Sequence, residues 1–266
     1  MRLRRAPARP VDARGRNLRL GTHAVEEALR AGRATSVLIQ RDLRDRPRLL
    51  AIAALARDAG VPVRLVPPEE LDALAGAERH QGVAAEAEAF QYFTLHDLME
   101  RPRAGDPFLL VLDGVEDPHN LGAILRSADA ADVDGVIVPE RRSAPVTPTV
   151  ARASAGAVDH VPVAQVVNLP RALASLKERG VWIYGLDAEG TTAFDEADYA
   201  RPVAIVAGAE GKGLGRLVRE SCDVLLRIPL YGHVESLNVS VAAALALFAA
   251  RRARDRVDER RETKDE

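Results

Sequence analysis

The residues best suited to chemistry lie in three stretches, each of which follows an apolar run. These stretches are "DGVEDPHN" from residue 113, "GAEGKGLG" from residue 208 and "PLYGHVESLN" from residue 229. Apolar runs of this kind are typical of buried parallel strands, and parallel α/β sheets bind ligands beyond the carboxyl ends of their strands. We therefore expect the three stretches to share one pocket.

The glycine-rich stretch fits neither of the common phosphate-binding patterns. A Walker A loop would need glycine at Val206 and serine or threonine at Gly213. The glycines from Gly211 to Gly215 are spaced by two, which breaks the dinucleotide pattern. The sequence thus argues against an ATPase and a standard NAD enzyme. What remains is either a loop carrying Glu210, whose glycines let the backbone approach a ligand, or a plain tight turn.

The stretch "DPHNLGAILRSADAA", residues 117–131, predicts a helix with Leu121, Ile124 and Leu125 on one apolar stripe. At about 100° per residue, Arg126 lies almost opposite that stripe. Asn120 stands just before it, where an N-cap is expected. From spacing alone, Asn120 is either a cap or an amide that faces a ligand. Arg126 is either a solvated charge or part of a site.

Metal binding and nucleophilic catalysis find little support in the sequence. The six histidines are scattered without a paired zinc motif, and no G-x-S-x-G elbow is present. The acidic loop around Asp113, Glu116 and His119 could hold a hard cation, but loops of this kind are more often solvated. Cys222 enters a predicted strand and is interpreted as a small core residue. We expect no bound metal.

Composition is that of an ordinary soluble protein of a reducing compartment. The 266 residues are 47% hydrophobic and 29% charged, with a net charge of -2 and one cysteine. The longest apolar run, "VSVAAALALFAA" at 239–250, is too short for a bilayer of about 30 Å. No signal-peptide core follows the basic N-terminus. These features predict a cytoplasmic protein without a membrane segment.

The pattern of helices and strands divides the chain into two α/β domains. Residues 1–19 form a basic arm, predicted to be disordered, which is either a phosphate contact or a solubilising tail. Residues 20–90 alternate short strands and helices, and residues 91–107 are predicted as a linker. Residues 108–252 form a regular parallel α/β domain, and residues 253–266 are a charged tail.

Three stretches of the second domain resemble the motifs of a known enzyme family. They are "LDGVEDPHNLGAILRSADAADVDGVIVP", "AIVAGAEGKGL" and "IPLYGHVESLNVSVAAALALF". Together they resemble the SpoU (TrmH-type) RNA 2′-O-ribose methyltransferases of the SPOUT class, over about residues 108–250. In the first domain, "GTHAVEEAL" and "RHQGVAAE" resemble the substrate-binding domain of the subgroup that methylates a guanosine in bacterial 23S ribosomal RNA.

The resemblance implies a fold and an assembly. The second domain would be a SPOUT α/β-knot, a parallel sheet whose C-terminal part threads through a loop as a trefoil knot. The first domain would be similar to ribosomal protein L30e. Patterning alone would not propose a knot, because knots are rare. S-adenosylmethionine would be the cofactor and large-subunit ribosomal RNA the partner. The protein would be a homodimer with its active site at the interface.

The resemblance also implies site residues by matching position. Asn120 and Arg126 match the first motif, with Arg126 at the catalytic arginine. Glu210 matches the acid of the second motif, and Ser236 and Asn238 match the polar pair of the third. Positions that hold S-adenosylmethionine in the family, the last two as less direct neighbours, are Gly208, Ile228, Leu237, Leu186 and Leu230.

Two alternatives stay open at this point. The target could be another ribosomal or transfer RNA nucleotide, including the adenosine whose methylation gives thiostrepton-type resistance. The chain could also be a non-catalytic RNA-binding or ribosome assembly protein, although the intact motif residues argue against it. The first domain carries basic side chains that either contact RNA phosphates or face solvent: Arg30, Arg33, Arg41, Arg44, Arg46 and Arg48.

Overall fold

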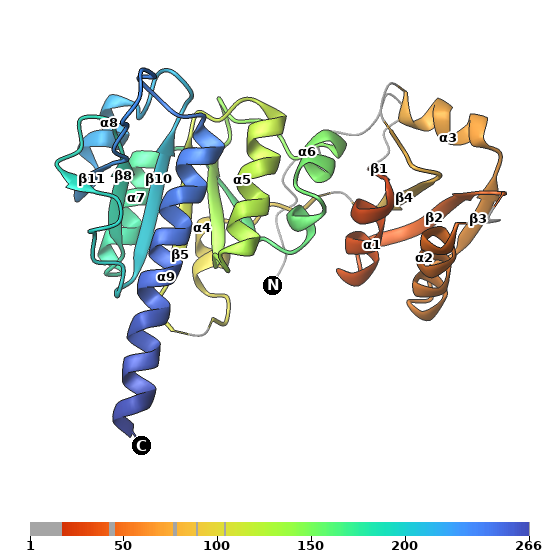
Figure 1. The fold of residues 1–266 in the computed structure, drawn as a ribbon, viewed down its shortest axis with the longest axis horizontal. Coiled ribbons are helices and arrows are strands. Elements are labelled where there is room, and N and C mark those ends of the chain that lie inside the picture. Colours follow the sequence, from red (N-terminus) through yellow and green to blue (C-terminus); the bar gives the residue numbers. More distant parts are fainter. Residues whose placement is uncertain (1–17, 43–45, 77–78, 89, 104, 266) are drawn as a thin grey trace. The chain divides into compact units, whose positions relative to one another are not determined.

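Two compact units make up the chain. The computed structural model describes residues 18–265 apart from 43–45, 77–78, 89 and 104, with side chains described as far as residue 256. One unit combines Met1–Gln91 with Pro145–His160, and the other combines Tyr92–Ala144 with Val161–Glu266. Figure 1 labels most of the helices and strands of both units.

The first unit is built on a four-stranded mixed sheet in the order β1-β4-β2-β3. β1 and β2 run antiparallel to β4, and β3 runs parallel to β2. Alternate residues of β2 face opposite sides, so that Ile39 packs with α1 and α2 whereas Leu38 packs with Leu71 of α3. The bounds are β1 Leu18–Leu20, α1 Thr22–Arg30, β2 Ala34–Gln40, α2 Pro47–Asp58, β3 Val63–Val66, α3 Pro68–Ala75 and β4 Val83–Ala87.

A segment from much later in the chain completes the first unit. α6 (Pro148–Ala153) contacts β1, and the short 3₁₀ helix η1 (Ala157–Asp159) contacts α1. Gly156, with φ +93°, allows this close approach, because a Cβ there would lie 2.4 Å from the Cβ of Glu27. The domain division predicted from the sequence assigns this segment to the second domain. The sequence of residues 145–160 does not indicate that this segment packs against β1 and α1, which lie far away along the chain.

The last residues of the predicted basic arm are ordered, contrary to the sequence-based expectation. Leu18–Leu20 forms β1, and Arg19 is only 2% exposed. Its guanidinium donates to both carboxylate oxygens of Asp159, at 2.9 and 2.6 Å. A run of arginines suggests solvation, but the acid that neutralises Arg19 stands 140 positions away and gives no local signal. The rest of the arm, residues 1–17, lies outside the described part of the chain.

The second unit contains a seven-stranded sheet in the order β7-β6-β5-β10-β8-β11-β9, and its strand pairs are parallel. The predicted parallel α/β class is therefore confirmed, while the threading of a trefoil knot stays a prediction. β10, late in the chain, lies between β5 and β8, so the strand order reverses there. The bounds are β5 Phe108–Asp113, β6 Gly135–Pro139, β7 Val163–Val166, β8 Trp182–Leu186, β9 Thr192–Ala193, β10 Val203–Gly208 and β11 Val224–Arg227.

Helices cover both faces of this sheet. α7 (Leu169–Glu178) and α8 (Arg216–Glu220) contribute to the apolar core on one face, and α5 (Pro118–Ala130) packs beside the long α9 (Val239–Asp265) on the other, as Figure 1 shows. α9 begins in the last motif and continues as a helix through the predicted charged tail. None of the described helices is both long and apolar enough to cross a membrane.

Much of the predicted linker is part of the second unit. α4 (Leu95–Met99) buries Leu98, which is 1% exposed, in the core of that unit. Phe93 forms a parallel bridge with Ala164 beside β7. The Pro/Gly cluster in residues 91–107 indicates a turn, but it says nothing about the apolar residues that precede it.

Candidate active site

The three stretches predicted to share one pocket do meet at the carboxyl edge of the parallel sheet, but around two cavities. The larger, about 720 Å³, is lined by the glycine-rich loop after β10 and by residues that follow β8 and β11. The smaller, about 340 Å³, lies between that loop and the residues that follow β5. Glu210 and Lys212 line both cavities. Strand ends beside a reversal of strand order are the expected place for a ligand in an α/β sheet.

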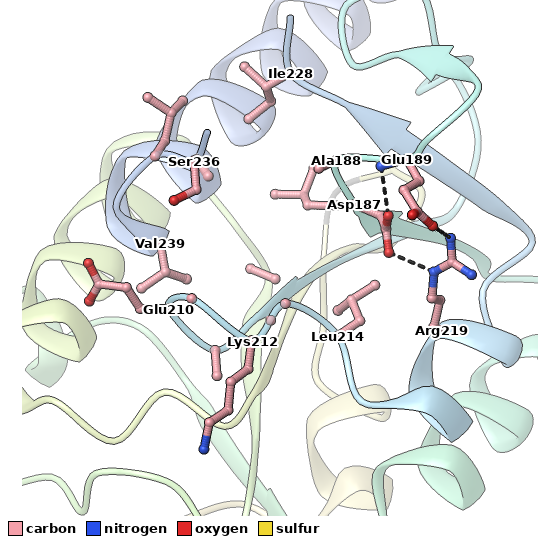
Figure 2. Close-up of a pocket in the computed structure, with 18 of the residues that line it drawn as sticks. Asp187, Ala188, Glu189, Glu210, Lys212, Leu214, Arg219, Ile228, Ser236 and Val239 are labelled. Atoms are coloured by element: carbon pink, nitrogen blue, oxygen red, sulfur yellow. Dashed lines mark hydrogen bonds and ion pairs between the residues drawn. The ribbon is translucent and has the colours of Figure 1, made fainter. Parts of the chain in front are cut away.

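The larger cavity brings together all five residues for which the resemblance implies cofactor contact. Its walls are mixed, because apolar side chains face the exposed backbone of the glycine-rich loop, and Glu210 and Glu235 add negative charge. Figure 2 shows Ile228 and Ser236 across the cavity from Leu214 and the loop. The five residues are Leu186, Gly208, Ile228, Leu230 and Leu237.

The loop after β10 is folded tightly on itself. The Ala209 N–H donates to the Gly213 carbonyl at 3.1 Å, and the Gly213 N–H donates to the Ala209 carbonyl at 2.9 Å. Gly211 and Gly213 have φ values of +72° and +63°, which glycine adopts without strain. A Cβ at Gly208 would lie 2.2 Å from the carbonyl carbon of Gly213. The loop is thus both a tight turn and a cavity wall, so the two sequence interpretations coexist.

Two carboxylates hold these walls in place, and sequence reasoning assigned this role to neither. Asp113, at the end of β5, is 7% exposed and accepts the Gly215 N–H at 2.7 Å. Asp187, just after β8, accepts from Arg219 Nε at 2.7 Å and from the Glu189 N–H at 2.9 Å (Figure 2). Burial raises the pKa of Asp187, but these hydrogen bonds outweigh it, so its pKa lies below the ordinary value. An acid directly after a buried strand was the available signal.

Side chains from all three motifs are joined by hydrogen bonds at the wall between the cavities. Asn120 Nδ2 donates to Glu210 Oε2 at 3.1 Å. Asn238 Nδ2 donates to Asn120 Oδ1 at 2.9 Å and lies 3.4 Å from Glu210 Oε1. Asn120 is 9% exposed, whereas Glu210 and Asn238 are exposed. This cluster can therefore orient a polar group without being sealed from it.

The structure excludes the N-cap interpretation of Asn120. Asp117 is the N-cap of α5, and its carboxylate accepts the His119 N–H at 2.8 Å. Pro118 occupies the first turn, where its missing N–H costs nothing. Asn120 therefore lies within the first turn of α5, and its side chain is directed to Glu210 and Asn238 instead of the helix end. Both Asp117 and Asn120 are good capping types, so the sequence alone could not choose between them.

The other two predicted site residues lie in different surroundings. Ser236 lines the larger cavity and is exposed. Arg126 is also exposed, on the second half of α5, and it lines neither cavity. Six residues of helix rotate it by about 240° from Asn120, so the two side chains leave α5 on different faces. Within one chain, Arg126 does not join the Asn120–Glu210–Asn238 cluster.

The described residues suit binding and orientation by polar groups. They include no group of three or more His, Cys, Asp or Glu side chains placed to hold a metal ion. Burial raises the pKa of Cys222 to about 12, so the thiol stays protonated near neutral pH. Its Sγ lies 3.3 Å from the Val218 carbonyl, and the side chain packs against the apolar core of the second unit. The side chains that line the two cavities offer an amide, carboxylates, a hydroxyl, an ammonium and guanidinium groups.

Comparison with known proteins identifies the family. Residues 107–248 match the model of the SpoU rRNA Methylase family, and residues 20–93 match that of the RNA 2′-O ribose methyltransferase substrate-binding domain. The chain belongs to the SpoU rRNA methylase family. TrmH family tRNA/rRNA methyltransferases of Staphylococcus saprophyticus and Bacillus subtilis are both 43% identical to it, over 91% and 90% of this chain and 97% of each relative. As a member of this family it is a TrmH-type RNA methyltransferase.

Solved structures of RNA methyltransferases share both units of the fold. An RNA 2′-O ribose methyltransferase is 31% identical with a TM-score of 0.75, covering 91% of this chain and 90% of the other. An AdoMet-bound rRNA methyltransferase from Sinorhizobium meliloti is 28% identical with a TM-score of 0.74, covering 91% and 88%. The SpoU methyltransferase AviRb of Streptomyces viridochromogenes, in complex with AdoMet, is 25% identical with a TM-score of 0.74, covering 89% and 90%.

Proposed function

We propose that this protein transfers the methyl group of S-adenosylmethionine to a ribose 2′-hydroxyl of ribosomal RNA, and that the target is a guanosine of 23S ribosomal RNA. One observation carries the proposal. Glu210 lines both a larger cavity suited to the cofactor and a smaller cavity suited to a ribose, and it is hydrogen-bonded to Asn120 and Asn238. Family membership and the substrate-binding match at residues 20–93 support RNA as the substrate.

The larger cavity fits S-adenosylmethionine in size and chemistry. Its volume of about 720 Å³ is in the usual range for small-molecule sites, about 300–1,000 Å³. Leu186, Ile228 and Leu237 offer apolar contact, the glycine-rich loop offers backbone polar groups, and Glu210 offers negative charge beside a cationic ligand. When bound, the cofactor supplies an electrophilic methyl group on a sulfonium sulfur.

The polar cluster orients the attacking ribose. In such a transfer, a bond from the 2′-oxygen to the methyl carbon would replace the carbon–sulfur bond, whose electron pair would stay on the sulfur, and the hydroxyl proton would pass to solvent. Asn120 and Asn238 are neutral donors and acceptors fixed by Glu210, so they can hold the hydroxyl in line with the methyl group. A permanently protonated arginine favours the alkoxide that develops and grips the adjacent phosphate. We assign this last role to Arg126.

We infer that Arg126 acts in the site of a second copy of the chain. In its own chain Arg126 is exposed and lines neither cavity. An apolar stripe on α9 is also uncovered, because Val241, Leu245 and Phe248 are 47%, 40% and 49% exposed at helical spacing. Tyr231, in the loop before α9, is 95% exposed. A homodimer would cover such a surface and bring Arg126 to its partner's cluster.

Mixed dimers test both the chemistry and the shared site. Arg126→Ala and Asn238→Asp should each abolish transfer of tritiated methyl groups to ribosomal RNA, while Arg126→Ala keeps cofactor affinity by calorimetry. When the two inactive chains are co-expressed with different tags, about a quarter of the wild-type activity should return, because half of random dimers carry one complete site. Verified heterodimers without activity, or a monomer by light scattering, would contradict the shared site.

The target is tested by mapping ribose methylation in ribosomal and transfer RNA from cells with and without the gene. Loss of one 2′-O-methylguanosine from 23S ribosomal RNA is the expected result. Loss at another ribosomal or transfer RNA position, or at the adenosine linked to thiostrepton resistance, would redirect the specificity. An unchanged methylation map with defective ribosome assembly would favour the non-catalytic alternative. With ribosomal RNA as substrate, we expect a cytoplasmic protein.

A further inference from the structure

A third cavity, of about 490 Å³, lies wholly within the first unit. Three separate segments line it: the turn from β1 into α1, the residues just before β4, and the end of α6 with the turn after it. It is distinct from both cavities at the edge of the parallel sheet. The lining residues are Leu20, Gly21, His23, Ala24, Arg79, Gln81, Arg152 and Ala155.

The cavity is built by specific contacts between the two stretches that carried the family resemblance in this unit. Gln81 Oε1 accepts from both the backbone N–H and the hydroxyl of Thr22, each at 3.0 Å. The Gly21 N–H donates to the Val83 carbonyl at 3.2 Å. These hydrogen bonds fix the start of α1 against the residues that precede β4, and so hold two of the three lining segments together.

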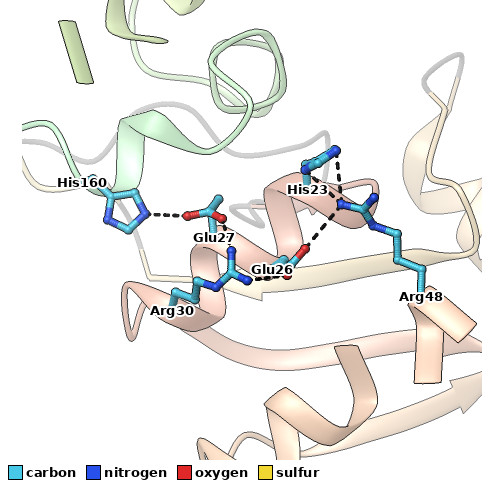
Figure 3. A network of polar contacts seen from close by, with 6 residues as sticks. All are labelled: His23, Glu26, Glu27, Arg30, Arg48 and His160. Atoms are coloured by element: carbon cyan, nitrogen blue, oxygen red, sulfur yellow. Dashed lines mark hydrogen bonds and ion pairs between the residues drawn. The ribbon is translucent and has the colours of Figure 1, made fainter. Parts of the chain in front are cut away.

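The third segment is held on the opposite side by charged contacts. The buried ion pair of Arg19 with Asp159 ties η1 to β1. His160 Nε2 lies 2.9 Å from Glu27 Oε2, which Figure 3 shows next to the Glu27–Arg30 pair. Arg152 of α6 and Ala155 just after it therefore line a cavity whose other lining residues come from the N-terminal part of the chain.

Backbone strain is concentrated at this cavity. Gln81 and Ala155 have φ values of +53° and +52°, in a region that non-glycine residues seldom occupy. Among the described residues only four non-glycine positions have positive φ, and these two both line the same cavity. Strained backbone of this kind clusters at ligand sites, where the surrounding structure holds it in place.

The lining is suited to an anion. Arg79 and Arg152 contribute guanidinium groups, and His23 contributes an imidazole. The first turn of α1 contains no acid, and a helix N-terminus favours negative charge. The nearby acids Glu26 and Glu27 do not line the cavity, and they pair with Arg30, Arg48 and His160 (Figure 3).

The arginines singled out from the sequence behave differently from Arg79 and Arg152. Arg30 pairs with both Glu26 and Glu27, and Arg48 contacts His23 and Glu26. None of those predicted arginines lines the cavity, and Arg44 lies outside the described residues. Arg30 and Arg48 pair with acids on the surface of α1, whereas Arg79 and Arg152 line the cavity.

We propose that this cavity binds a backbone phosphate of the RNA substrate, as a grip remote from the methylated ribose. The inference rests on the proposed function for its ligand, because residues 20–93 match a substrate-binding domain for RNA methylation. It adds that the grip is composite, since Arg152 comes from the stretch matched by the methylase family. A phosphodiester fits better than a free metabolite, because binding of RNA is dominated by phosphate contacts to arginine.

The test compares two variants that remove the same charge from the same unit. Arg79→Gln changes a lining residue, whereas Arg57→Gln changes an exposed arginine of α2 that does not line the cavity. Binding of a radiolabelled 23S ribosomal RNA transcript to the full-length protein is measured between about 50 and 200 mM salt. We expect Arg79→Gln alone to weaken binding at least threefold and to reduce the salt slope by about 0.7–0.9, the value for one phosphate contact.

The outcomes separate this inference from the proposed function. RNA binding is measured independently of methyl transfer. A wild-type protein that binds RNA but never methylates it would therefore contradict the proposed function and leave the proposed phosphate site unaffected. Equal effects of Arg79→Gln and Arg57→Gln, or no RNA binding by the wild type, would overturn the grip. Calorimetry with inorganic phosphate distinguishes the source, since tight binding of free phosphate with no competition against RNA would also overturn it. Unchanged cofactor affinity and melting temperature would confirm that Arg79→Gln folds.

Discussion

The two units use polar residues in opposite ways. At the edge of the parallel sheet, Glu210 and Asn238 are exposed and bonded to the nearly buried Asn120, so the cluster is fixed yet open to a ligand. In the first unit the ion pair of Arg19 with Asp159 is sealed from solvent. The first arrangement can act on a substrate, while the second can only hold the molecule together. Burial, more than residue type, separates a working polar group from a structural one.

The largest effect should come from breaking the sealed pair. Arg19→Met leaves Asp159 charged and unpaired, and the free energy of unfolding should fall by about 3–5 kcal/mol. Urea unfolding of the first unit measures this. Arg64→Met breaks the exposed pair with Glu70 and should cost less than about 1 kcal/mol. The comparison fails if both variants lose the same stability.

A second variant sharpens the explanation. In Arg19→Met/Asp159→Leu both charges are gone, so most of the lost stability should return. Cofactor binding by the second unit should be unaffected in the single and double variants, because neither residue lines its cavities. A double variant as unstable as Arg19→Met would show that shape, and not charge, makes the contact important.

A smaller effect is expected from Gly208→Ala in the second unit. The new Cβ would lie 2.2 Å from the Gly213 carbonyl carbon and 2.5 Å from the Leu214 nitrogen, so the loop must move. Affinity for S-adenosylmethionine should fall about tenfold or more, which corresponds to at least about 1.4 kcal/mol. Gly232→Ala is the control, because a Cβ there meets nothing within 4 Å. Calorimetry showing equal affinities would mean that the loop is not a rigid wall.

The smallest effect concerns Cys222, which packs against the apolar core of the second unit. Burial raises its pKa to about 12, so the folded protein should react negligibly with a thiol reagent at pH 8 and normally once unfolded in urea. The linkage has a definite sign, because a raised pKa stabilises the fold below the unfolded value of about 9 and the contribution fades as pH rises towards 12. Rapid labelling of the native protein would contradict this packing.

Sequence reasoning succeeded where the evidence is local. β5 and β10 are nearly continuous apolar runs, β11 is a shorter one, and a motif follows each of the three, so the meeting of the three stretches could be predicted. It failed where the partner is distant. Arg19 looked solvated because its partner Asp159 is remote along the chain. Arg126 illustrates a third limit, since helix geometry gives its direction but not what a second chain would place opposite it.

The Arg19–Asp159 pair also has a consequence for biosynthesis. A ribosome adds about 5–20 residues per second, so β1 leaves the exit tunnel several seconds before its acid partner exists. Until residue 159 emerges, the N-terminal unit lacks the charge that neutralises Arg19 and the segment that covers β1. The N-terminal unit therefore cannot finish folding first, although it is made first. A fragment ending at residue 91 would be stranded in the same unfinished state, so a minimal version of this unit has to include residues 145–160.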